Sequence, residues 1–462
     1  MDQKTKRKLR ILSLILFIVG GILLSGYSRG YRFDWEKGKL VQTGGFFIQN
    51  NQERTTVSIN GKDQKTNKRI FLTKGALVEN LIPQTYEVFI EGDGFEPWYK
   101  QLPVHPGFIT EIKFVILFPR NIELEKIDDI EKELVIVRND GLFYITRDKN
   151  GLFLKINEPD GKHAMIIKLP KFGSDEKNIL LKGMSSSKNY AVFADESTDQ
   201  WFAFNLKEQK IDILSVNTID SFAFDENDNL YIFKDGKLYI KRPADQSVAL
   251  FLEKQILGFT IFNNEIFYIN KASSSLEKIN RNGRNNIKIA DLEVKNNLPK
   301  TINVINESTI ALYGENSDFT LIETSQSREM KKTLIDKDIQ QISFDKNKEK
   351  IAYIKKINEV FELWIYYTKS FDQQPQKPKG SKELILKSTT DIEKIDWFQY
   401  KDFSQHLFWL SDKTINITEI DNRDRLNTYR LATDVSDFFY KPSEQILLEI
   451  KTDGIWQAKI NL

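Results

Sequence analysis

The sequence of 462 residues contains no cysteine and only three histidines, His105, His163 and His406. The absence of cysteine excludes disulfide bridges, thiolate metal sites, iron–sulfur clusters and cysteine nucleophiles. Three scattered histidines are too few for a histidine-rich metal centre. Glycine-rich phosphate-binding motifs do not occur either. The sequence therefore predicts no catalytic, cofactor-binding or metal-binding residues, and it does not identify ligand-binding residues.

Charge of either sign is nearly balanced, with 67 basic and 65 acidic residues and a net charge of +2. The first ten residues contain five basic side chains and one acidic, a net +4, so the remaining 452 residues carry −2. A basic surface of the kind that binds nucleic acid is therefore not indicated. Hydrophobic residues make up 40% of the sequence and charged residues 29%, which is typical of folded domains.

Residues 11–28, ILSLILFIVGGILLSGYS, form a continuous uncharged run. As a helix this run is about 27 Å long, just enough to cross a bilayer core of about 30 Å. A buried core helix would have a polar face, which this run lacks. The basic residues before it also fit a cleaved signal peptide, although no Ala-x-Ala cleavage pattern follows. We expect residues 1–28 to be a basic cytoplasmic stub and an uncleaved transmembrane helix that contacts the lipid bilayer through residues 11–28.

The position of the basic residues predicts the orientation of this helix. Positively charged flanks stay on the cytoplasmic side, and all five early basic residues precede the apolar run. Aromatic residues typical of a membrane interface lie around its end: Tyr27, Tyr31, Phe33 and Trp35. We expect a single-pass cell-membrane protein with a cytoplasmic N-terminus, a juxtamembrane linker at residues 29–43, and the bulk of the chain outside the cytoplasm.

Short segments with alternating apolar residues begin at Gly44. They predict strands at residues 46–48, 56–59 and 85–90, and Asn60-Gly61 predicts a tight turn. Such a spacing of strands and turns indicates a small β-domain.

This region contains three motifs, Val57-x-Ile59-x-Gly61-Lys62, Leu81-x-Pro83-x-x-Tyr86-x-Val88 and Gly94-Phe95-x-x-Trp98. In their order and spacing they resemble the PEGA family over about residues 44–118. The sequence departs from the family at the name-giving tetrapeptide, where it has Gln52-Glu53-Arg54-Thr55, and at Gln84, where the family usually has glycine. The resemblance implies a small, non-catalytic β-sandwich at residues 44–119, which acts outside the cytoplasm as a spacer or as an adhesion and assembly unit.

Trp98 permits two interpretations. Its ring could stack on a sugar, or it could fill the core beside Tyr86 and Phe95. We expect core packing, because a small sandwich needs large apolar side chains to bury.

Residues 120–462 repeat one plan, in which an apolar strand, a polar turn and a second apolar strand follow one another. The first apolar residues of the second strands are Leu134, Tyr190, Leu230, Ile266, Ile310, Ile351, Leu407 and Ile446. The intervals between successive markers scatter about the repeat length of a four-stranded propeller blade, which is roughly 40–45 residues. The alternative, a pair of irregular β-sandwich domains, needs about 100 residues per unit and does not fit this period. We therefore expect a β-propeller of seven or eight blades.

The pattern of Phe344-Asp345 followed by Ile351-Ala352-Tyr353 resembles the divergent WD40-like and TolB-like repeats. The Gly-His and Trp-Asp signatures of WD40 repeats do not occur, so the resemblance implies a fold and no binding residues. The last repeat has only three candidate strands. The alternating segment at residues 122–127 is a candidate for the missing outer strand, which would close the ring.

Two polar segments and the histidines have simple interpretations. Asp225–Asn229 has the composition of a calcium loop, but its sixth position is Leu230 and not glycine, so we expect an ordinary hairpin turn. Residues 368–383 contain two prolines and a glycine, and we expect an exposed hairpin loop that is a tolerated insertion and has no function of its own. All three histidines are expected at the surface or at strand edges.

The sequence as a whole predicts an all-β protein with one N-terminal transmembrane helix, and no enzyme. We expect a membrane-anchored extracytoplasmic binding or scaffolding protein of the bacterial cell envelope, with the propeller as its interaction platform and an envelope protein or a glycan as its partner. The alternative is an envelope glycan hydrolase, for which the 65 acidic residues leave room. Such an enzyme needs paired carboxylates that converge in a pocket at the propeller mouth.

Overall fold

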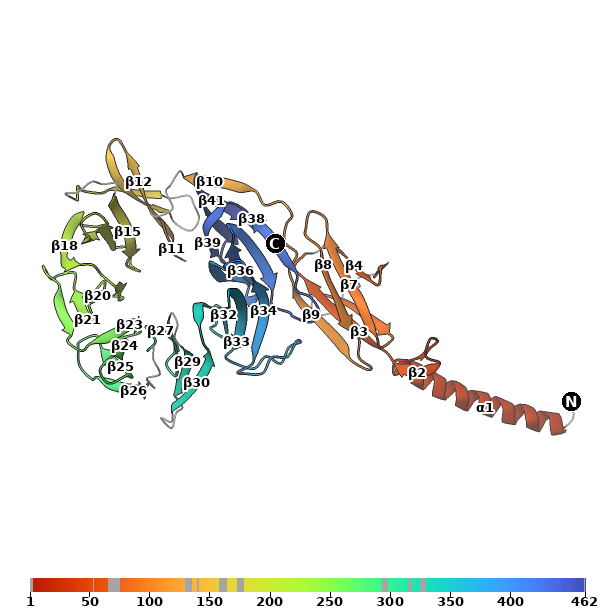
Figure 1. Cartoon of the computed structure of the whole chain (residues 1–462). Helices are drawn as coiled ribbons and strands as arrows, with labels where there is room; N and C mark the ends of the chain where they lie inside the picture. The colour runs from red at the N-terminus through yellow and green to blue at the C-terminus, as the bar shows by residue number, and fades with distance from the viewer. Residues whose placement is uncertain are drawn as a thin grey trace.

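The N-terminal helix projects away from the rest of the molecule (Figure 1). The computed structural model describes residues 3–462, except for residues 53, 65–74, 129–134, 139–140, 158–163, 173–177, 293–297, 315–317, 325–329 and 461. Helix α1 (Gln3–Ser28) contains a stretch, Arg10–Ser28, that is long and apolar enough to cross a membrane and is not buried at all. This helix is compatible with a single-pass membrane anchor and with a signal sequence.

The segment expected to be a linker contains a two-stranded hairpin, β1 (Tyr31–Asp34) and β2 (Lys39–Gln42). The buried carboxylate of Asp34 holds its turn, because Oδ1 accepts hydrogen bonds from the backbone N–H groups of Glu36 and Lys37, each at 3.1 Å. This local side-chain-to-backbone bonding stabilises the turn of the hairpin within the segment.

Residues 44–115 form two packed sheets, here named the β-sandwich domain. Its strands are β3 (Gly44–Asn50), β4 (Thr55–Ile59), β5 (Lys62–Asp63), β6 (Ala76–Leu81), β7 (Thr85–Gly92), β8 (Trp98–Pro103) and β9 (Ile109–Val115). One sheet has the order β6-β3-β9 and the other β5-β4-β7-β8, with β3 and β9 parallel. The predicted strands fall within β3, β4 and β7, and Asn60 and Gly61 both have positive φ, as the predicted tight turn requires.

The residues described between Leu124 and Lys459 form eight four-stranded antiparallel sheets, here named the propeller. The first four sheets after β10 (Leu124–Asp128) contain β11 (Val135–Arg138), β12 (Gly141–Asp148), β13 (Gly151–Asn157), β14 (Ala164–Lys168), β15 (Ile179–Met184), β16 (Tyr190–Asp195), β17 (Gln200–Asn205), β18 (Lys210–Asn217), β19 (Ser221–Phe224), β20 (Leu230–Lys234), β21 (Lys237–Lys241), β22 (Ala249–Leu252), β23 (Ile256–Phe262), β24 (Glu265–Asn270), β25 (Ser275–Asn280) and β26 (Ile287–Asp291). The remaining sheets contain β27 (Thr301–Asn306), β28 (Thr309–Tyr313), β29 (Phe319–Thr324), β30 (Met330–Asp336), β31 (Ile339–Phe344), β32 (Lys350–Ile357), β33 (Val360–Tyr367), β34 (Lys382–Ser388), β35 (Lys394–Tyr400), β36 (Phe403–Ser411), β37 (Thr414–Glu419), β38 (Thr428–Ala432), β39 (Val435–Lys441), β40 (Ile446–Lys451) and β41 (Gly454–Lys459).

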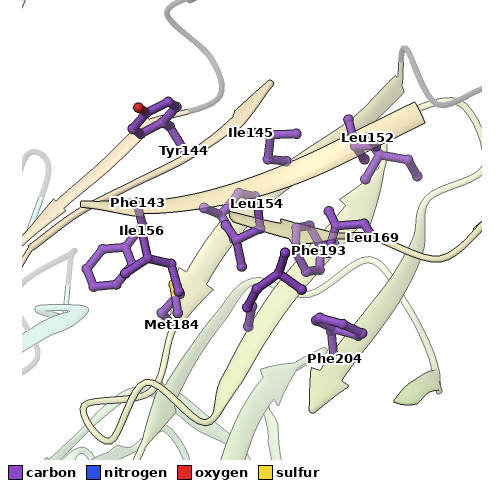
Figure 2. Packing of buried hydrophobic residues seen from close by; sticks show 14 of the residues in the cluster. Phe143, Tyr144, Ile145, Leu152, Leu154, Ile156, Leu169, Met184, Phe193 and Phe204 are labelled. Carbon is purple, nitrogen blue, oxygen red and sulfur yellow. The ribbon is translucent and has the colours of Figure 1, made fainter. Parts of the chain in front are cut away.

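Hydrophobic clusters join each sheet of the propeller to the next one along the chain. One further cluster contains Leu154 of the first sheet, Phe193 of the second, and Leu448 and Ile455 of the last. Figure 2 shows part of this cluster, in which Leu154 lies close to Phe193 between the first and second sheets. Because the last sheet shares a cluster with the first, the apolar faces of the sheets are buried around a ring, as in a β-propeller.

The first and last parts of the propeller meet as the sequence predicts. Strand β10 pairs with β41, with Leu124 opposite Ala458 and Glu125 opposite Gln457, and so supplies the outer strand of the last sheet. Seven of the eight predicted markers lie in the second strand of a sheet. The eighth marker, Leu134, lies outside the described residues, and β11, the strand that follows β10, is the first of its sheet. Since β10 closes the ring, the next strand has to begin a new sheet.

Candidate functional site

The two histidines that the structure describes have different environments. His105 is exposed in the turn between β8 and β9, as predicted, whereas His163 lies outside the described residues. His406 on β36 is only 2% exposed, so the expectation of a surface or edge position is wrong for this residue. Burial, together with the nearby charge of Lys100, lowers the pKa of His406 to about 3. No group of three or more potential metal ligands occurs among the described residues.

The Asp225 segment is a hairpin turn, as predicted. Oδ1 of the buried Asp225 accepts hydrogen bonds from the backbone N–H groups of Asn227 and Asn229, at 2.9 and 3.0 Å. Its carboxylate therefore holds the connection between β19 and β20.

Four carboxyl groups have a pKa raised by burial, which is a property of many catalytic acids: Asp345, Asp396, Glu419 and Glu449. Each interacts with partners of its own. Asp345 faces Lys350, Asp396 accepts a hydrogen bond from the backbone of Trp397, and Glu449 pairs with Lys451. The burial and these local partners account for the raised pKa values of the four groups, and no hydrogen bond joins any two of them.

The fourth of these carboxylates, Glu419, belongs to a buried polar cluster between the β-sandwich domain and the propeller. Lys100 on β8 is fully buried, and its Nζ lies 2.9 Å from Oε1 of Glu419 at the end of β37. The same ammonium donates hydrogen bonds to the backbone carbonyls of Asp421, Arg423 and Arg425, at 2.6, 3.0 and 2.6 Å. Residues 419–425 thus surround the charge of Lys100 with oxygen atoms, which offsets the cost of its burial.

A second charge pair shapes the loop that surrounds Lys100. The guanidinium of Arg423 donates to both carboxylate oxygens of Asp421 and, through Nη1, to the backbone carbonyl of Glu111 at 3.0 Å. Burial alone would raise the pKa of Asp421, but the hydrogen bonds from Arg423 lower it. The loop therefore has a fixed shape, and it also contacts β9 at the edge of the sheet β6-β3-β9.

Trp98 belongs to the core of the β-sandwich domain, as predicted, and is 1% exposed. Its indole Nε1 donates a hydrogen bond of 2.9 Å to Oε2 of Glu419. A ring buried in this way has no face open to a sugar, so Trp98 connects the two domains instead.

Amide side chains of the propeller pair with one edge strand of each sandwich sheet, β8 in one and β9 in the other. Asn427 accepts from the backbone N–H of Tyr99 at 3.3 Å and donates to its carbonyl at 3.2 Å, as a neighbouring strand would. On β9, Gln374 accepts from the N–H of Glu111 at 3.0 Å and donates to the carbonyl of Ile109 at 3.2 Å. Unpaired backbone groups at strand edges favour aggregation, and these two amides provide hydrogen-bond partners for such groups on β8 and β9.

The role of Gln374 corrects the expectation for residues 368–383. This segment does contain the loop between β33 and β34, but through Gln374 it pairs with the β-sandwich domain and is not a mere insertion. The sequence contains one signal for the cluster as a whole. In β8, Trp98, Lys100 and Leu102 alternate onto the same buried face, and a lysine at such a position requires a partner.

We predict that Gln374→Ala loosens the edge of β9. Loss of its two hydrogen bonds removes about 1 kcal/mol, so the amide hydrogen of Glu111 should exchange with deuterium about fivefold faster. Hydrogen–deuterium exchange of the full chain in detergent measures this effect. The control is Gln376→Ala in the same loop, which is exposed and does not contact β9. Equal exchange in the two variants would contradict the assigned role of Gln374.

The largest of the cavities described at the junction has a volume of about 490 Å³. It lies between the β-sandwich domain and the turn that joins β35 to β36, and its lining includes Gln52, Phe114 and Phe403.

Comparison with known proteins yields structural similarity only. No protein-family model matches the sequence, so the resemblance to the PEGA family is not supported by this comparison, and no curated protein matches it. Among solved structures, Hsv2 of Kluyveromyces lactis matches with 8% identity and a TM-score of 0.42, over 64% of this chain and 97% of that one. Hydrazine synthase of Kuenenia stuttgartiensis matches with 9% identity and a TM-score of 0.37, over 60% and 95% of the two chains. The tricorn protease matches with 10% identity and a TM-score of 0.27, over 80% and 44%. At this level of similarity these proteins say nothing about the activity of this chain, and its assignment as a β-propeller rests on its own strand order and packing.

Proposed function

We propose that the chain is a single-pass, membrane-anchored scaffolding or binding protein of the bacterial cell envelope, without catalytic activity, whose propeller is the interaction platform. The observation that carries this proposal is the buried junction around Lys100. An interface that buries a paired charge and occupies two strand edges holds the β-sandwich domain and the propeller in one relative position. The propeller would then be presented at a fixed distance from the membrane.

Contacts at the membrane end support the same arrangement. The guanidinium of Arg32 in the hairpin lies 3.6 Å from the ring centroid of Tyr27 in α1, and it donates a 2.7 Å hydrogen bond to Asn80 at the end of β6. Thr43 Oγ1, just after β2, donates to the carbonyl of Gly30 at 2.7 Å. The helix, the hairpin and the β-sandwich domain are therefore joined by specific contacts, as an anchored support would need.

The finer identity of the two domains is part of the proposal. The PEGA-like motif residues Val57, Tyr86 and Trp98 lie on β4, β7 and β8 and are buried, which supports a PEGA-like sandwich. The eight four-stranded sheets among the described residues support a propeller of eight blades.

The orientation is tested by labelling single introduced cysteines, because the natural sequence has none to give background. Lys207→Cys, at an exposed turn between β17 and β18, should react with a membrane-impermeant maleimide in intact spheroplasts. Gln3→Cys should react only after the membrane is made permeable.

The pattern of labelling separates the possible outcomes. Labelling of Lys207→Cys only in permeabilised cells would place the propeller in the cytoplasm and overturn the proposal. If mass analysis of the purified Gln3→Cys protein shows that the N-terminal segment is missing, the helix is a cleaved signal and not an anchor.

A further inference from the structure

The hairpin of β1 and β2 has one apolar face, which is exposed. Tyr31 and Phe33 alternate onto this face, and Leu40, the cross-strand partner of Phe33, points to the same side. These three side chains are 38%, 44% and 61% exposed. Trp35, in the turn, is 86% exposed, and its ring packs edge-on against that of Phe33, with the two centroids 4.8 Å apart. The four side chains together are here named the apolar face of the hairpin.

The opposite face of the hairpin is held against the rest of the molecule. The guanidinium of Arg32 donates hydrogen bonds to the carbonyl of Tyr27 in α1, at 2.9 Å, and to Oδ1 of Asn80 at the end of β6, at 2.7 Å. Asp34 lies on the same side of the hairpin as Arg32 and is buried. The hairpin thus lies between α1 and the β-sandwich domain (Figure 1), and its apolar face points away from both contacts.

The level of the hairpin relative to a membrane follows from the length of α1. Its apolar stretch, Arg10–Ser28, is about 28 Å long at 1.5 Å per residue, close to the bilayer core of about 30 Å. When α1 spans the bilayer, Ser28 lies at the boundary with the headgroup layer, which is roughly 5–8 Å thick. Arg32, in the middle of β1, contacts Tyr27 in the last turn of α1, and so holds the hairpin at the level of the headgroups.

The charge around the apolar face suits anionic headgroups. Residues 29–42 contain four basic side chains and two acidic, a net +2. The carboxylate of Asp34 is buried and accepts hydrogen bonds within the turn. The exposed charges are therefore the cations of Arg29, Lys37 and Lys39 and the anion of Glu36. Basic residues close to a membrane surface attract anionic lipids, and tryptophan and tyrosine rings favour the headgroup level.

We propose that the apolar face of the hairpin docks into the headgroup layer of the bilayer, with anionic lipid as its partner. This second membrane contact, beside α1, keeps the β-sandwich domain from tilting about the end of the helix. A second copy of the chain is a less suitable partner, because a symmetric contact between two hairpins brings Lys37 and Lys39 of both copies together. The inference rests on the proposed function, since it requires α1 to be a membrane anchor.

The test measures tryptophan emission of the full chain in nanodiscs that contain one copy each and phosphatidylglycerol, with and without bromine on the acyl chains near the headgroups. Bromine quenches only rings close to it. The other six tryptophans lie on β8 and in the propeller, so the natural protein minus Trp35→Phe gives the emission of Trp35. We expect brominated lipid to remove about half of this emission, because the ring lies at the interface.

A change to the apolar face separates docking from mere closeness to the membrane. Phe33→Ser combined with Leu40→Ser removes much of the apolar area and should reduce quenching of Trp35 about threefold. The control is Leu250→Ser combined with Ile287→Ser, which are 47% and 49% exposed on outer strands of the propeller. This control should be quenched like the natural protein.

A change of charge tests the role of anionic lipid without altering the apolar face. Lys37→Gln combined with Lys39→Gln should reduce quenching about twofold in discs that contain phosphatidylglycerol, because it removes both exposed lysines of the hairpin. In discs of phosphatidylcholine alone this variant should match the natural protein. The control is Lys207→Gln combined with Lys210→Gln, at an exposed turn of the propeller, which should match the natural protein in both kinds of disc.

Three results would overturn the inference: no quenching of Trp35, equal quenching in the double serine variant and the natural protein, or no effect of the lysine changes in anionic discs. An unquenched Trp35 together with crosslinking between hairpins in discs of two copies would assign the face to a second copy. Failure of the chain to enter nanodiscs would overturn the proposed anchor as well, whereas entry without quenching would overturn this inference alone.

Discussion

Replacing Lys100 with methionine is expected to lower the free energy of unfolding by about 3–5 kcal/mol, because the change leaves a buried carboxylate without its counter-charge. Lys100 is fully buried, and Glu419, with 5% exposure, has little access to water that could replace the ammonium. Three backbone carbonyls of residues 421–425 also lose their donor. Urea unfolding of the full chain in detergent micelles measures the change.

Two further variants separate the buried pair from a general effect of removing a lysine. Lys113→Met removes a partly exposed partner of Glu111 on β9 and should change the free energy of unfolding by at most about 1 kcal/mol. The double variant Lys100→Met, Glu419→Gln should lose about 1–3 kcal/mol less free energy of unfolding than the sum of the losses of the two single variants. Each single variant already breaks the ion pair, so the second change has no ion pair left to break. A loss for Lys100→Met as small as that for Lys113→Met would show that the buried pair does not stabilise the junction.

Acidification from pH 8 to pH 5 is expected to remove about 2 kcal/mol of stability through His406 alone. Its pKa is about 3 in the folded protein against 6.5 for the ordinary group. Between these values the unfolded chain binds the proton and the folded chain does not, so stability falls as pH decreases below 6.5, by about 1.4 kcal/mol per pH unit. The contribution of neutral His406 to the free energy of unfolding is fully present above pH 6.5. It would be completely lost near pH 3.

The His406→Phe variant isolates this contribution because phenylalanine does not titrate and its ring suits the neighbouring rings of Phe118 and Phe398. Between pH 8 and pH 5 its free energy of unfolding should fall by about 2 kcal/mol less than that of the natural protein, since the linked proton is absent. His105→Phe, which changes an exposed histidine, should follow the natural protein. Parallel pH profiles for His406→Phe and the natural protein would contradict the burial of a neutral histidine.

Both expectations concern the same part of the molecule, since the charge of Lys100 contributes to the low pKa of His406. The ion pair at the junction therefore stabilises the folded protein, and removing either of its charges should destabilise it. If the chain supports a binding surface at a fixed distance from a membrane, this junction is where a single substitution would most easily release the propeller.

Much of the fold is encoded by neighbours in the sequence, and was predictable for that reason. The helix over residues 11–28 was predicted from the composition of its apolar run alone. Alternation of apolar residues over a few positions predicted strands such as β4 and β7. The spacing of the repeats predicted a ring, and the unpaired alternating segment near residue 124 predicted its closure on β41.

The junction and the cavity were decided by tertiary structure alone. Trp98 and Glu419 are 321 residues apart, and no local pattern specifies which loop of the propeller a domain edge will contact. His406 lies on β36, the second strand of its sheet, which is covered by strands on both sides, so alternation does not reveal that its ring is buried. The ring contact between Phe114 of β9 and Phe403 of β36 likewise joins strands that are far apart in the sequence. Local sequence fixes elements through contacts between near neighbours, whereas sites between domains depend on how those elements pack.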